Sequence, residues 1–126
     1  MNGWRLFFLA AGLFNLAGGV VGALTLESQL AAMGRPAPVY PFAFELLFVA
    51  VAILGLGYLM VAWDPVAHRG IVWIGAATKL AGGLMSWRAI ATGQMPAETW
   101  WQAVVTDWIW LVAFVVFLAT TPPDGE

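Results

Sequence analysis

Long apolar stretches constrain this chain more than any other feature of its sequence. Four of them, at about residues 4–25, 42–62, 68–90 and 99–119, are long enough to cross a bilayer as helices, which takes about 20 mainly apolar residues. None carries a polar stripe wide enough for a helix on the surface of a soluble protein. We therefore predict an all-α membrane protein in which residues 1–126 form a single transmembrane domain. We expect the four helices to form an up-down-up-down bundle.

Composition supports a membrane location and excludes several other classes of protein. Of the 126 residues, 62% are hydrophobic and 10% are charged, whereas soluble domains have about 45–50% apolar and about 25% charged residues. A domain of this size buries only about two thirds of its surface, so the apolar excess does not fit inside a soluble monomer. The five basic residues are scattered and the net charge is −2, so we expect no nucleic-acid partner. With no cysteine and one histidine, we expect neither a metal nor a cofactor.

The connections between the stretches have the composition of loops and turns. Residues 26–40 contain polar residues, glycine and proline, and within them residues 26–33 could form a short interfacial helix that Gly34 ends. Residues 63–65, Trp-Asp-Pro, predict a tight turn into the third helix. Residues 92–96 predict a similar turn into the fourth.

The basic residues favour one orientation. Arg5, Arg69 and the amino terminus lie at one end of the predicted helices, and Arg35 and Arg88 lie at the other. Four spans place both termini on the same side of the membrane. The positive-inside rule then predicts that both termini face the cytoplasm.

A short internal repeat relates the first stretch to the third. Residues 15–19, Asn-Leu-Ala-Gly-Gly, match residues 79–83, Lys-Leu-Ala-Gly-Gly, 64 positions later, and half of the chain is 63 residues. Two tandem two-helix repeats would explain the match, and so would chance, because these residue types are common in membrane helices. Under either explanation, small residues share a helix face with the central Asn15 or Lys79. Such strips let membrane helices approach closely.

Three polar side chains stand near the middle of predicted spans. With a rise of about 1.5 Å per residue, Asn15, Lys79 and Asp107 lie about 13–16 Å from a helix end, in a hydrocarbon core about 30 Å thick. A lone charge at that depth costs on the order of 3 kcal/mol. We therefore predict a buried salt bridge between Lys79 and Asp107, with Asn15 hydrogen-bonded to both. Trp110 shares the face of Asp107 and completes this predicted polar centre.

Glu45 and Arg88 form a second predicted pair, within about 6 Å of the outer end of their helices. Because both side chains can reach the interface, a structural role is favoured for this outer pair. The polar centre has two interpretations: it lines a ligand site or a pathway, or it is a clamp that fixes the helix register.

Three hypotheses for the function follow. The first is a small non-enzymatic membrane protein that acts as an accessory subunit or binds an apolar ligand around Asn15, Lys79 and Asp107. Its partners would be the lipid bilayer, the apolar ligand, and a larger membrane complex or further copies of the chain. The second is a proton-coupled or small-solute carrier, expected to be a dimer. The third is a membrane enzyme on a lipid-like or quinone-like substrate, disfavoured because a carboxylate tied to a lysine is poorly poised as a general acid.

Several segments also resemble a known group of proteins. They are the early Asn15, residues 63–69 (Trp-Asp-Pro-Val-Ala-His-Arg), residues 75–79 and residues 106–108 (Thr-Asp-Trp). With its four predicted spans, the chain resembles small uncharacterised bacterial membrane proteins of the DoxX-like type over most of its length. The resemblance implies a multi-pass protein of the bacterial inner (cytoplasmic) membrane. DoxX proteins proper are linked to quinone-coupled sulfur oxidation, and the resemblance assigns that activity to no residue of this chain.

Overall fold

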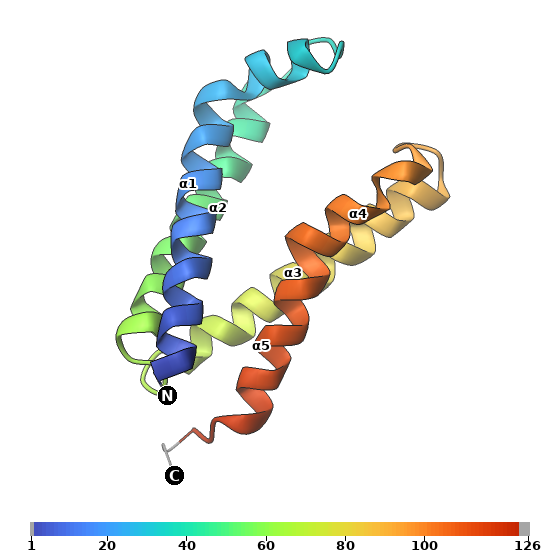
Figure 1. The fold of residues 1–126 in the computed structure, drawn as a ribbon. Helices are drawn as coiled ribbons and strands as arrows, with labels where there is room; N and C mark the ends of the chain where they lie inside the picture. Colours follow the sequence, from blue (N-terminus) through green and yellow to red (C-terminus); the bar gives the residue numbers. More distant parts are fainter. Residues whose placement is uncertain (1, 124–126) are drawn as a thin grey trace. The chain divides into compact units, whose positions relative to one another are not determined.

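The computed structural model describes residues 2–123, and every regular element in this range is helical (Figure 1). All four predicted helices are present. The last of them is made of four consecutive elements that together run from Ala97 to Thr120. The elements in chain order are α1 (Asn2–Ala32), α2 (Pro41–Trp63), α3 (Arg69–Ala91), the 3-10 turn η1 (Ala97–Thr99), α4 (Trp100–Ala103), the π-helical turn η2 (Val104–Trp108) and α5 (Ile109–Thr120).

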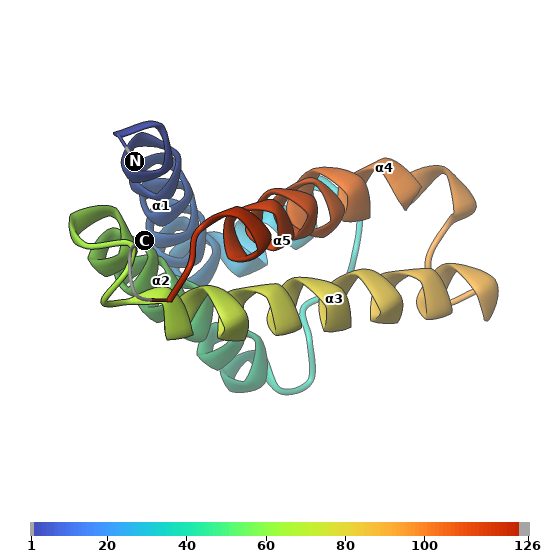
Figure 2. The same cartoon turned by 90° about the horizontal axis from the view of Figure 1, so that it is seen from below.

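The chain divides into two compact units, Met1–Pro65 and Val66–Glu126. Each unit is a helical hairpin: α1 packs along α2 in the first, and α3 packs along the Ala97–Thr120 segment in the second (Figures 1 and 2). The boundary falls two residues beyond the midpoint of the sequence. The four-helix bundle stays a prediction, because the structure defines the two hairpins separately.

Glycines set the close packing of the first unit. A Cβ atom placed on Gly19 would lie 2.5 Å from the main-chain oxygen of Phe48, and one placed on Gly12 would lie 2.9 Å from the main-chain oxygen of Gly55. These distances leave no room for a methyl group, so only glycine permits the approach of the two helices. Gly18 differs, because nothing lies within 4 Å of a Cβ atom placed there. The predicted small-residue strip is therefore confirmed except at Gly18.

The first helix is longer than predicted. Residues 26–33 do not form a separate interfacial helix; the first part continues α1 to Ala32, and Figure 1 shows α1 changing direction before this end. Gly34 then ends the helix with a φ of +67°. The N–H of Gly34 bonds to the carbonyl of Ala31 at 3.0 Å and that of Arg35 to Leu30 at 2.8 Å, which is a Schellman cap. Gly34 thus stops the helix as predicted.

In the second unit, hydrogen bonds cap the carboxyl-terminal ends of both α3 and α5. Gly93, with a φ of +76°, ends α3 in the same manner, and the N–H of Gln94 bonds to the carbonyl of Ala89 at 2.8 Å. At the other end, the Arg69 guanidinium donates to the main-chain oxygens of Leu118, at 2.5 Å, and of Thr121. These carbonyls at the end of α5 would otherwise lack a partner in the helix.

Within residues 2–123, three helical segments are long and apolar enough to cross a membrane: Asn2–Ala32, Pro41–Trp63 and Ala97–Thr120. The predicted third span forms the helix α3, but this helix does not meet the same criterion of length and composition. The reason lies in its middle part, where glycines, threonine, lysine and serine replace large apolar residues. Several of these small and polar residues contact the Ala97–Thr120 segment.

Candidate functional site

A π-helical turn interrupts the Ala97–Thr120 segment at the predicted polar positions. Within η2, Val104–Trp108, the main chain follows a wider turn, and the N–H of Ile109 bonds to the carbonyl of Val104, five residues back. π turns are rare and concentrate at functional sites. Because the extra residue displaces the regular hydrogen-bond pattern, such a turn makes main-chain carbonyls accessible to donors from side chains.

Two side chains donate to carbonyls of this turn. The Trp110 indole N–H donates to the main-chain oxygen of Val105 at 2.9 Å. The Lys79 ammonium reaches across from α3 and donates to the main-chain oxygen of Thr106 at 2.8 Å. The π turn therefore supplies an uncharged partner for a cation in an apolar helix pair.

Asp107 lies against a glycine of the neighbouring helix. A Cβ atom placed on Gly82 would lie 2.8 Å from Asp107 Oδ1, so any larger residue on α3 would displace the carboxylate. The Thr106 hydroxyl lies 3.1 Å from Asp107 Oδ2 and 2.8 Å from the main-chain oxygen of Gln102, so its single proton is shared between these two acceptors. Thr106 thus contacts both charged groups of the site, Lys79 through its carbonyl and Asp107 through its hydroxyl.

The predicted salt bridge between Lys79 and Asp107 is not found. Within the described part of the chain the two residues form no ion pair, and the ammonium takes the carbonyl of Thr106 instead. The physical reason is the π turn. It leaves the main-chain carbonyl of Thr106, the residue directly before Asp107, within hydrogen-bond distance of the ammonium. The structure nevertheless places Lys79 and Asp107 around the same residue, Thr106.

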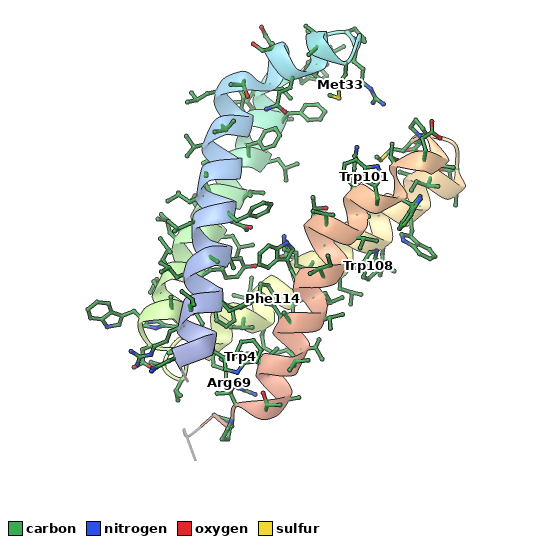
Figure 3. The ribbon with its side chains drawn as sticks, in the orientation of Figure 1. Trp4, Met33, Arg69, Trp101, Trp108 and Phe114 are labelled. Atoms are coloured by element: carbon green, nitrogen blue, oxygen red, sulfur yellow. The ribbon has the colours of Figure 1, made fainter. Side chains whose placement is uncertain are left out.

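The indole of Trp108 packs against Gly83, the residue that follows Gly82 on α3. Figure 3 labels Trp108. A Cβ atom placed on Gly83 would lie 2.6 Å from the indole of Trp108, and Trp87 meets the same indole edge-on, with ring centroids 6.4 Å apart. The Trp108 indole nitrogen is buried, and no described residue accepts a hydrogen bond from it. The Gly-Gly pair of the internal repeat therefore accommodates Asp107 and Trp108 in this unit.

The other predicted site residues lie in part in the first unit. Asn15 is buried, with 6% of its surface exposed, and its Cβ lies 3.0 Å from a Cβ atom placed on Gly55 of α2. Its hydrogen bonds to Lys79 and Asp107 stay a prediction, because these residues belong to the second unit. The same holds for the outer pair, since Glu45 lies on α2 and Arg88 on α3.

Sequence reasoning did not identify Thr106 as a site residue. Its position directly before Asp107 is the only signal in the sequence, and its role depends on the π turn. Gly82 was predicted as a packing residue, whereas the structure shows that it also makes room for a carboxylate.

The chemistry of the site is that of a polar binding centre in an apolar setting. An ammonium has three donors, and one of those of Lys79 is used on Thr106. A carboxylate accepts about four hydrogen bonds, and Asp107 receives at most one from Thr106, whose hydroxyl it shares with the main-chain oxygen of Gln102. Among the described residues, no group of three or more His, Cys, Asp or Glu side chains could hold a metal ion.

Comparison with known proteins identifies no relative: no family model, no curated protein and no solved structure matches this chain.

Proposed function

We propose that this chain is a small integral membrane protein that binds the polar head of an apolar ligand at the Lys79–Asp107 site. The observation that carries the proposal is the arrangement around Thr106, which holds the two charged groups near one another without an ion pair. Both groups keep hydrogen-bonding capacity that no other described residue takes up. A ligand with an acceptor and a donor on one polar head would use that capacity.

The energetics favour a ligand over a purely structural clamp. Charged groups within a membrane are expensive unless they have partners. If the two charges served only to fix the helix register, a direct ion pair would be the expected arrangement. Instead, the Lys79 ammonium donates to a main-chain carbonyl and the Asp107 carboxylate accepts from a hydroxyl. The indole of Trp108, which follows Asp107 in the chain, packs against Gly83 and Trp87, and such flat apolar side chains suit a lipid-like or quinone-like molecule.

The membrane placement belongs to the same proposal. The apolar segment Ala97–Thr120 is a candidate span, and α3 would cross beside it with Lys79, Gly82 and Gly83 turned toward this partner. All four helices would then cross a bacterial inner membrane as an up-down-up-down bundle with both termini in the cytoplasm. The resemblance to DoxX-like proteins supports this placement.

The test is the identity of lipid-soluble molecules that copurify with the protein in mild detergent, measured by mass spectrometry after solvent extraction. Lys79→Met and Asp107→Asn preserve size and remove the charges. Hydrogen bonds to charged groups contribute about 1.5–3 kcal/mol, so each variant should retain at least about tenfold less of the bound molecule. Far-UV circular dichroism would check that the variants stay helical.

Arg35→Gln is the matched control. This substitution also removes one charge, but Arg35 lies in the connection between α1 and α2 and outside the proposed site. It should retain the molecule at the level of the unmodified protein. An identical set and amount of extracted molecules from the unmodified protein, Lys79→Met and Asp107→Asn would refute the proposed binding function.

A further inference from the structure

A groove lies on the first unit, where the beginning of α1 meets the end of α2. It has a volume of about 470 Å³, and its lining residues are Arg5, Leu6, Leu9, Leu59, Ala62 and Trp63. Its walls are almost entirely apolar, and Arg5 is the charged residue among those that line it. The groove thus combines one cation with an open apolar surface.

The helix periodicity explains why these residues line one groove. Positions 5, 6 and 9 share a face of α1, and positions 59, 62 and 63 share a face of α2. Leu59 also packs against Gly12, where a Cβ atom would lie 2.6 Å from its methyl group. The tight glycine contact between the helices therefore borders the groove.

The position of the groove along the helices matters as much as its composition. Arg5 stands in the first turn of α1 and Trp63 is the last residue of α2, and both helices are candidate membrane spans. In a bilayer these two residues would lie at the boundary between acyl chains and head groups, where Arg and Trp side chains are favoured. Trp63 is 81% exposed, so its indole is available to a molecule in that layer.

We propose that this groove binds one anionic phospholipid, with an acyl chain along the apolar walls and the phosphate on Arg5. Charge complementarity supports this occupant, because no carboxylate of the described residues forms an ion pair with Arg5. A guanidinium binds phosphate oxygens in a two-pronged geometry that a zwitterionic head group would partly oppose. Basic pockets between membrane helices are recognised sites for anionic lipid head groups.

Native mass spectrometry of the detergent-solubilised protein tests the proposal by counting bound lipids in titrations with phosphatidylglycerol and phosphatidylcholine. We expect one preferred phosphatidylglycerol per chain. Arg5→Gln should lower the preference about fivefold, the effect of one basic residue near an anionic head group. Arg35→Gln removes the same charge from the same unit outside the groove and should leave the preference unchanged.

A second variant tests the apolar part of the site. Ala62→Phe fills the groove and should weaken binding of phosphatidylglycerol even with Arg5 in place. Equal binding of the two lipids, or equal losses from Arg5→Gln and Arg35→Gln, would overturn the proposal. Displacement of the lipid by millimolar inorganic phosphate would assign the site to a free anion and would overturn it as well. Lys79→Met should leave this binding unchanged, which separates it from the proposed ligand site.

Discussion

Two adjacent glycines of α1 should respond in opposite ways to the same substitution. A Cβ atom on Gly19 would lie 2.5 Å from the main-chain oxygen of Phe48 and 2.6 Å from the main-chain nitrogen of Ala52. Ordinary contact begins at 3.4 Å, so the helices would have to separate by about 0.9 Å (3.4 minus 2.5). No rotamer change relieves this clash, because the opposing atoms are main chain. Nothing lies within 4 Å of a Cβ atom on Gly18.

The expected magnitudes follow from packing and helix propensity. Overpacking costs typically about 1–3 kcal/mol, and a separation near 1 Å forfeits up to about half of the dispersion energy of the contacts concerned. Replacing glycine by alanine in a helix returns about 1 kcal/mol. Gly19→Ala should therefore destabilise the first unit by up to about 2 kcal/mol, whereas Gly18→Ala should stabilise it by up to about 1 kcal/mol.

The assay is unfolding of the purified protein in mixed micelles with increasing sodium dodecyl sulfate, followed by far-UV circular dichroism. The two variants differ by one methyl group at neighbouring positions, so each is the control for the other. Stabilities that agree within about 0.5 kcal/mol would refute the packing of α1 on α2 described above. A destabilised Gly18→Ala would refute it too.

Three further substitutions test the second unit and the helix caps in the same unfolding assay. Arg69→Ala removes two hydrogen bonds from a charged donor to the end of α5 and should cost about 2–3 kcal/mol, whereas Arg69→Lys should recover part of this loss; no change would contradict the cap. Thr106→Val removes the hydroxyl that is shared between Asp107 and the main-chain oxygen of Gln102, should cost about 1 kcal/mol, and should change the amount of extracted ligand, because the carboxylate loses this donor. Gly34→Ala places a side chain at a φ of +67° and should cost about 1–2 kcal/mol, and a neutral result would argue against the cap of α1.

Hydropathy and turn chemistry predicted most of the secondary structure. Apolar runs predicted all four helices, because a main chain in an apolar environment must satisfy its own hydrogen bonds. Gly34 was expected to stop the first helix, and the structure gives it the positive φ that other residues avoid. The length of α1 was missed, because residues 26–32 are polar enough to suggest a break although their propensity still allows a helix.

Local pattern did not predict how the charges are satisfied. Opposite charges at similar depth suggested that Lys79 and Asp107 pair directly, but the π turn offers the carbonyl of Thr106 to the ammonium. The glycines at positions 82 and 83 leave space for the side chains of Asp107 and Trp108, which both belong to this turn.

The apolar helices, their approximate ends and the small-residue faces follow from residue type along the chain, because side-chain transfer energies and main-chain preferences act locally. Whether a given glycine faces a main chain, a carboxylate or open space follows from how the helices of each hairpin pack. The partner of Lys79 depends on the same packing. These contacts change when the distance between two helices changes by a few tenths of an ångström. The order of residue types along the chain does not specify such distances.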